Sequence, residues 1–138
     1  MTASVAMTTL VVDDYDRAIA FYRDALGLTL VADTDMGGGK RWVVVSGPKG
    51  GRLLLAKAAD EAQRAAIGRQ AGGRVGFFME TDDFAADHAA FVAQGVVFRE
   101  APRHEAYGTV AVFEDPFGNL WDLIEPRVQA LGPGPMAG

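Results

Sequence analysis

The residue whose type fits its surroundings least is Asp122, which stands between Trp121 and Leu123. The run Leu120–Ile124 otherwise has the apolar and β-branched composition of a strand, where Asp is disfavoured. A carboxylate in such a strand needs a cation, hydrogen-bond donors, a metal ion, or water in a cleft. Two interpretations stay open: a strand carboxylate satisfied by a neighbouring Arg, a Tyr or water, and a group that contacts a ligand. Metal ligation is disfavoured against both.

Histidine is the side chain best suited to acid–base chemistry near neutral pH, and the chain has two of them. His88 stands beside two alanines in a helical pattern, where a surface imidazole is expected. His104 lies in the segment 102–108, which we expect to form a loop entering a strand. There it is either a solvated histidine or a donor or base in a pocket. Asp122 and His104 are therefore the candidate catalytic residues, and no Ser-His-Asp triad can be assembled from the two histidines.

The composition excludes several classes of site and partner. The 138 residues include no cysteine, so disulfides, thiolate nucleophiles and cysteine-ligated metals are excluded. A net charge of −5 without a basic patch argues against nucleic acid. No apolar run reaches the ~20 residues that span a bilayer, and the N-terminus lacks a signal pattern. We therefore expect a cytoplasmic protein with a small-molecule partner and no nucleic-acid or membrane partner.

The elements that would position these residues follow from apolar periodicity and turn signals. Strands are expected over residues 6–12, 28–32, 41–45, 52–56, 74–80, 96–99, 109–113 and 120–124, and helices over residues 15–26, 58–70 and 83–94. Asp115-Pro-Phe-Gly-Asn119 separates the last two strands with residues typical of a hairpin turn. Residues 36–39 (Met-Gly-Gly-Gly) are expected to form a flexible loop.

An internal repeat becomes visible when these elements are aligned. The two copies are Asp13-Asp-Tyr15 followed by Tyr22 and Gly27, and Asp82-Asp-Phe84 followed by Phe91 and Gly95. Each copy is preceded by a strand and followed by three more, so the order β-α-β-β-β occurs twice. This predicts an α+β protein with a first βαβββ module over 1–57, a linker with a short helix over 58–73, a second module over 74–126 and a flexible tail over 127–138.

The repeat, together with Val12–Tyr22, Leu26-Gly27 and Phe113–Asp122, resembles the vicinal oxygen chelate superfamily. That superfamily includes glyoxalase I, bleomycin-resistance proteins and extradiol dioxygenases, and the resemblance spans roughly Val5 to Glu125. It implies two βαβββ modules that form a curved mixed sheet around a cleft, usually within a homodimer.

The resemblance also places the positions that hold a divalent metal in family enzymes, on the first, fourth, fifth and eighth strands. They correspond to Met7, to Leu54 or Leu55, to Gly76 and to Asp122. Only Asp122 can bind a hard divalent ion well, whereas a catalytic metal needs about three protein ligands. We therefore predict no cofactor, and a divalent metal is disfavoured.

These observations predict a protein that binds a small organic molecule in a metal-free cleft, as in the sequestration of a drug or metabolite. The residues expected to contact the ligand are Met7, Trp42, Phe78, Tyr107 and Asp122. The alternative is a lyase, isomerase or dioxygenase-type enzyme of the same superfamily. Such an enzyme would use a divalent metal or acid–base residues.

Overall fold

The chain divides into two compact units, and each contains its own sheet and helices. The computed structural model describes residues 1–127. The first unit comprises Met1–Gln70 and the second Ala71–Gly138. The boundary between them falls inside the segment 58–73 that was expected to be a linker. The tail predicted over 127–138 lies, after Arg127, outside the described residues.

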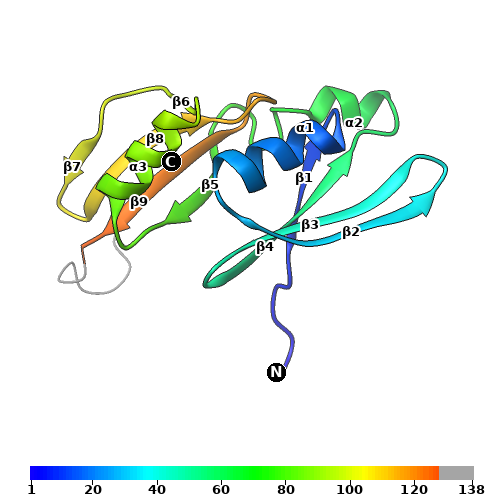
Figure 1. Ribbon diagram of the computed structural model, residues 1–138, viewed down its shortest axis with the longest axis horizontal. Coiled ribbons are helices and arrows are strands. Elements are labelled where there is room, and N and C mark those ends of the chain that lie inside the picture. The colour runs from blue at the N-terminus through cyan, green and yellow to red at the C-terminus, as the bar shows by residue number, and fades with distance from the viewer. Residues whose placement is uncertain (128–138) are drawn as a thin grey trace. The chain divides into compact units, whose positions relative to one another are not determined.

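The first unit is built on a four-stranded mixed sheet (Figure 1). In spatial order its strands are β1 (Thr8–Val12), β4 (Gly50–Lys57), β3 (Lys40–Gly47) and β2 (Thr29–Gly37). The β1–β4 pair is parallel and the other two pairs are antiparallel. This arrangement makes β1 an edge strand, and the side-chain amide of Gln70 covers part of its edge. That amide accepts from Val11 N at 2.7 Å and donates to Thr9 O at 2.9 Å.

The helix of the first unit covers one face of this sheet. It begins as α1 (Tyr15–Ile19) and continues as the π-helical segment η1 (Ala20–Ala25). Asp14 caps its start by accepting from Arg17 N at 2.8 Å, and Gly27 follows its end with φ 77°. The acidic start and the glycine stop predicted from sequence are both confirmed. A short helix, α2 (Glu61–Ala66), follows β4 and starts at the N-cap Asp60.

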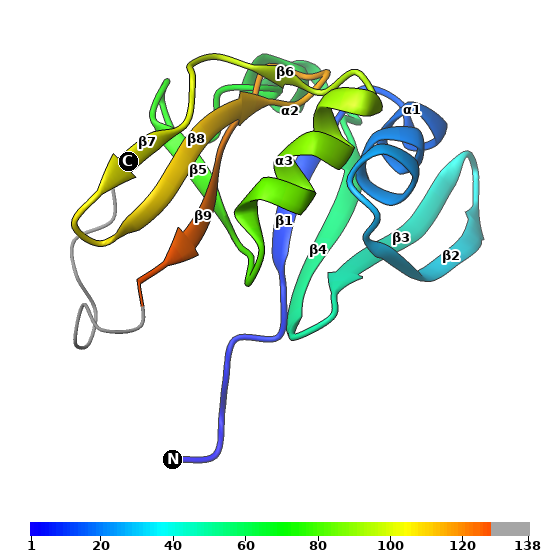
Figure 2. The same cartoon turned by 60° about the vertical axis from the view of Figure 1, so that its left-hand side comes forward.

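The two faces of this sheet differ in burial because successive side chains of a strand point to opposite sides. The fully buried face carries Leu10, Val12, Val43, Val45 and Leu55. It packs against α1, as Figure 2 shows. The opposite face carries Thr9, Trp42, Leu54 and Ala56, all of which stay at least partly exposed. This second face is the one available to a ligand.

The second unit has a five-stranded sheet with one helix. Its strands are β5 (Val75–Glu80), β9 (Leu120–Pro126), β8 (Gly108–Glu114) and β6 (Val97–Phe98) in spatial order, with β7 (Arg103–Glu105) also paired to β8. The helix α3 (Phe84–Ala93) has Asp83 as its N-cap, whose carboxylate accepts from Ala86 N at 3.1 Å.

Aromatic side chains form the core between α3 and the sheet of the second unit. The Trp121 ring stacks on Phe77 at 4.9 Å and on Phe113 at 5.9 Å between centroids. Phe91 of α3 meets Phe113 edge-on at 5.7 Å. Since Trp121 points toward the helix, its neighbour Asp122 points to the opposite face of the sheet.

The α+β class with two βαβββ units, predicted from the element order, is confirmed, and the second unit adds the short strand β7 to that order. The hairpin at Asp115 is confirmed too: the Asp115 carboxylate accepts from Phe117 N at 2.9 Å and from Asn119 N at 2.8 Å. No helix within residues 1–127 is long and apolar enough to cross a membrane.

Two local expectations were wrong, both for the same physical reason. Residues 36–39 are not a four-residue loop, because β2 runs on to Gly37 and pairs there with Lys40. Only Gly38 and Gly39 form the turn, with φ 64° and 82°. His104 is not in a loop either, since Arg103–Glu105 pairs with β8 as β7. In both places cross-strand hydrogen bonding extends a strand through residues whose local propensity is poor.

Candidate functional site

A hollow of about 520 Å³ lies within the first unit, over the open face of its sheet. Its floor is formed by Thr9, Leu54 and Ala56, and Trp42 lines it beside them. Thr9 lies opposite Leu54 in the β1–β4 ladder, and Leu54 lies opposite Val44 in the β4–β3 ladder. The floor therefore consists of side chains that strand alternation places on one face.

The walls of the hollow come from the start of α1, from the β2–β3 hairpin and from the segment that leads into α2. Tyr15, Arg41, Lys57 and Gln63 are among the residues that line it. The Tyr15 hydroxyl accepts a hydrogen bond from Arg41 N at 3.1 Å, which ties the helix start to β3. Tyr15 is only 8% exposed, so it is a fixed part of the wall.

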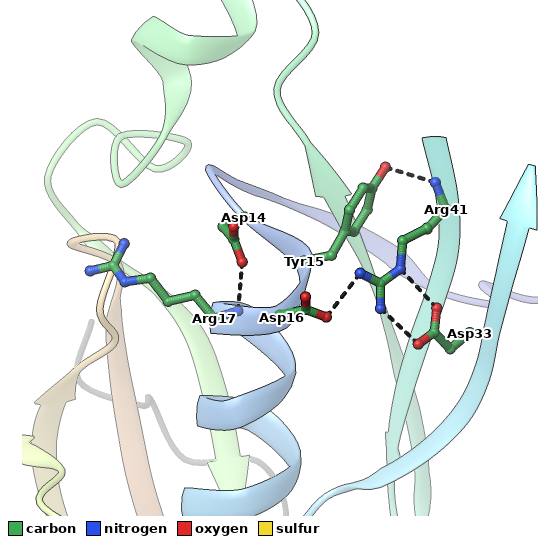
Figure 3. A network of polar contacts seen from close by, with 6 residues as sticks. All are labelled: Asp14, Tyr15, Asp16, Arg17, Asp33 and Arg41. Carbon is green, nitrogen blue, oxygen red and sulfur yellow. Dashed lines mark hydrogen bonds and ion pairs between the residues drawn. The ribbon is translucent and has the colours of Figure 1, made fainter. Parts of the chain in front are cut away.

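Arg41 holds these walls together through an ion-pair network (Figure 3). Its guanidinium donates to Asp33 at 3.0 Å and 2.8 Å, and to Asp16 at 2.9 Å. It also lies 5.1 Å from the centroid of the Tyr15 ring, within cation–π range. Hydrogen bonding from Arg41 lowers the pKa of Asp33, and the bonds to Asp33 and Asp16 raise the pKa of Arg41. The network positions the hairpin against the helix start.

Asp122, in the second unit, is the most unusual polar group of the described chain. Its side chain is 1% exposed, and neither carboxylate oxygen has a hydrogen-bond partner among residues 1–127. Burial raises its pKa to about 6; the nearby Arg103 opposes this rise and Glu100 adds to it. In the ladders it lies opposite Phe78 and Val112.

Arg103 does not satisfy Asp122 because its own hydrogen bonds go elsewhere. Its guanidinium donates to Glu100 at 2.9 Å and to Glu105 at 3.2 Å. Its bond with Glu100 is the main reason that the pKa of Arg103 is raised, with a smaller contribution from a hydrogen bond with Tyr107. The interpretation of Asp122 as a carboxylate bonded to an Arg or a Tyr therefore finds no such bond within the described residues.

The remaining candidates occupy different environments. His104 is exposed, and its Nδ1 lies 3.3 Å from Thr109 Oγ1. His88 is only partly exposed, since its ring lies 5.4 Å from that of Phe84 and 4.2 Å from that of Phe98. Met7 is half-buried directly before β1.

Among the five predicted contact residues, Trp42 lines the hollow of the first unit. Phe78, Tyr107 and Asp122 belong to the second unit, where Phe78 lies opposite Asp122. Convergence of all five on one cleft stays a prediction. Sequence reasoning missed Tyr15, Arg41, Lys57 and Gln63. Tyr15 stood in the repeated Asp-Asp-aromatic motif but was interpreted only as a mark of the fold, and Lys57 and Gln63 carried no signal.

The positions that hold a metal in family enzymes offer few donors here. Leu54 lines the hollow, whereas Leu55 is fully buried on the helix side of the sheet. Leu54 therefore corresponds to the metal-ligand position on β4. A Cβ added to Gly76 would lie 2.8 Å from the Cβ of Ala71, which leaves no room for a ligating side chain there. Within residues 1–127, no group of three or more His, Cys, Asp and Glu side chains could hold a metal ion.

Comparison with known proteins places this geometry in a family. Residues 4–123 match the Glyoxalase/Bleomycin resistance protein/Dioxygenase superfamily. An uncharacterised protein of Shewanella frigidimarina is 49% identical over 128 residues, which cover 91% of this chain and 95% of that protein.

Two crystal structures are similar over almost their whole length. One is UcmS2, with a TM-score of 0.77 and 27% identity over 91% of this chain and 99% of that chain. The other is TnmS3, an antibiotic binding protein from Streptomyces sp. CB03234, with a TM-score of 0.73 and 28% identity over 92% of this chain and 99% of that chain. With its two βαβββ units and a family match over most of its length, the chain belongs to the Glyoxalase/Bleomycin resistance protein/Dioxygenase superfamily.

Proposed function

We propose that this protein binds a small organic molecule with an apolar, aromatic body and sequesters it in a metal-free cleft. The observation that carries the proposal is the hollow in the first unit. Its volume of about 520 Å³ is in the range of small-molecule sites. Leu54 and Ala56 offer an apolar floor, and Trp42 offers an indole that is 38% exposed. A half-exposed indole beside an apolar floor suits stacking on a flat ring.

The contacts between the walls support the proposal that the binding site is preformed. Arg41 connects the hairpin to the helix start through Asp33 and Asp16, and Tyr15 is buried against them. A preformed site loses less conformational entropy when a ligand binds. The antibiotic-binding relative TnmS3, 28% identical over 92% of this chain, favours a similar role here.

The metal-free part of the proposal rests on the donor set. Of the four family positions, Met7, Leu54 and Gly76 offer no imidazole or carboxylate. Asp122 alone supplies one ligand, where a catalytic metal needs about three. The residues present therefore do not fit a transition-metal centre, and we derive no chemical step through one.

An acid–base enzyme is the second candidate, and one observation favours it. The pKa of Asp122, raised by burial to about 6, is close to the range that general acid–base catalysis uses. His104, the other candidate, is exposed and lies beside Thr109. Product formation from a bound compound would support this candidate over sequestration.

A thermal-shift screen of aromatic compounds, with and without a chelator, tests the proposed function. A compound at about 100 times its Kd stabilises the folded state by about 2.7 kcal/mol, enough to raise the Tm clearly. Trp42→Ala should weaken binding of the hits by about tenfold, since it removes the stacking surface. The control Val97→Ala alters an apolar residue that is 58% exposed in the second unit and should leave binding unchanged. Loss of binding with chelator would contradict a metal-free cleft, and equal binding by the Trp42 variant would contradict this location.

A further inference from the structure

The charged residues that line the hollow of the first unit are all basic. The chain has 18 acidic and 13 basic residues and a net charge of −5. The lining of the hollow nevertheless includes no Asp or Glu, while Lys40, Arg41 and Lys57 all belong to it. In a protein with a net charge of −5, a concavity whose charged lining residues are all basic departs from the average composition.

Several acidic residues close in sequence to the lining have partners of their own, and none of them lines the hollow. Asp13 pairs with Arg17 at 2.8 Å, and Asp60 accepts from Gln63 N at 2.8 Å as the cap of α2. Glu61 pairs with Arg64 at 3.1 Å. Asp33 and Asp16 are both bonded to Arg41.

The three basic residues of the lining differ in whether they form ion pairs. Arg41 is bonded to two carboxylates, those of Asp16 and Asp33. Lys40 and Lys57 are exposed and take part in no ion pair found within residues 1–127. Among the cations of the lining, the two lysine ammonium groups are therefore the ones without an ion-pair partner within residues 1–127.

The neutral polar groups of the lining add hydrogen-bond donors. The Tyr15 hydroxyl accepts from Arg41 N at 3.1 Å, which leaves its own proton available for donation. The Gln63 Oε1 accepts from Ala59 N at 2.7 Å, which leaves the two protons of its amide nitrogen. These groups donate, and an anionic oxygen is the acceptor that they and the lysines share.

We propose that the hollow selects a ligand in anionic form: an apolar aromatic body that bears a carboxylate or a phenolate. The body lies on Leu54, Ala56 and Trp42, and the negative oxygen faces Lys40 and Lys57. This inference rests on the proposed function, because it names the chemical class of the bound molecule. It adds that charge, and not only the apolar area, decides what binds.

The test compares naphthalene carboxylate with naphthalene carboxamide, which share a ring system and differ in charge at neutral pH. Calorimetric titration at low salt should show the carboxylate binding several-fold more tightly, since each partly exposed ion pair contributes up to about fivefold. The Lys40→Gln/Lys57→Gln double variant should bind both probes with the affinity that the wild type has for the carboxamide. Raising the salt concentration should weaken carboxylate binding only.

Lys49→Gln is the matched control, because it removes a third lysine of the same unit that does not line the hollow. It should keep the preference for the carboxylate. Equal affinity of the wild type for both probes would overturn the charge inference and leave the proposed function standing. Equal loss of preference in the Lys49 variant would overturn the assignment to Lys40 and Lys57. Failure of both probes to bind would overturn the inference together with the proposed aromatic site.

Discussion

Arg41 and Asp33 form a two-pronged ion pair on the β2–β3 hairpin, with Nε–Oδ1 and Nη2–Oδ2 distances of 3.0 Å and 2.8 Å. Arg41 lies opposite Asp35 in the ladder, so the pair runs diagonally to the neighbouring position on the same face. The same guanidinium reaches Asp16 on α1, and one side chain thus joins the hairpin to the helix (Figure 3).

Replacing Arg41 with Lys should loosen the walls of the hollow. An ammonium group cannot make two parallel bonds to Asp33 and reach Asp16 at the same time. We expect a lower Tm and weaker binding of naphthalene carboxylate than in the wild type. Arg64→Lys, in the exposed pair of α2 with Glu61, is the matched control and should change neither quantity. If the Arg41 and Arg64 variants have the same Tm and the same affinity for naphthalene carboxylate, the ion-pair network of Arg41 does not shape the site.

Replacing Asp122 with Asn should make the protein more stable above neutral pH. The pKa of Asp122 rises from 3.8 to about 6 on folding, so the folded state favours the protonated carboxyl. Its contribution to stability is complete below about pH 4 and is lost as the pH rises through about 6, a difference of about 3 kcal/mol. Urea unfolding at about pH 4 and about pH 8 should show the gain only at the higher pH.

The exposed Asp35 supplies the control for this experiment. Asp35→Asn should give no gain in the free energy of unfolding at about pH 8, since its carboxylate is exposed to solvent and accepts from Gly37 N at 2.8 Å. A loss of stability in the Asp122 variant at the higher pH would mean that the carboxylate has a partner in the folded protein. That result would support the interpretation of Asp122 as a strand carboxylate with a hydrogen-bond or ion-pair partner.

The purified protein should carry no stoichiometric transition metal. Gly76 leaves no room for a ligand on β5, and Leu54 offers none on β4. Elemental analysis of protein prepared without a metal-affinity step is the measurement. About one zinc, nickel or iron ion per chain, lost in Asp122→Asn, would show that a metal site exists.

We also predict a homodimer, as the resemblance to the superfamily implies. Several large apolar side chains are exposed on the single chain, among them Val31, Phe78 and Val97. Apolar surface of this kind favours association. Light scattering at micromolar concentration should give twice the chain mass of 14.6 kDa. Truncation of residues 128–138 should leave that mass per assembly nearly unchanged, and a monomer would refute the prediction.

Local sequence chemistry predicted the elements of this protein well. Asp14 and Asp83 cap helices, Gly27 ends one, and Asp115 organises a hairpin, each through bonds within a few residues. Such interactions act over short stretches of chain, so their residue types are sufficient to reveal them. The repeated element order then indicated the α+β class and the family.

The sequence also singled out Asp122, because a carboxylate in an apolar strand conflicts with its surroundings at any tertiary arrangement. The hollow of the first unit could not be predicted from the sequence. Lys57, Tyr15 and Arg41 come from three separate segments, and only the pairing of strands brings them to one concavity. Its electrostatics depend further on which ions pair: Arg41 is bonded to Asp33 and Asp16, whereas Lys40 and Lys57 are not paired within residues 1–127. The sequence by itself determined the elements and the family. The tertiary structure decided which cations of the hollow have an ion-pair partner, because ion pairing depends on distances between segments remote in the chain.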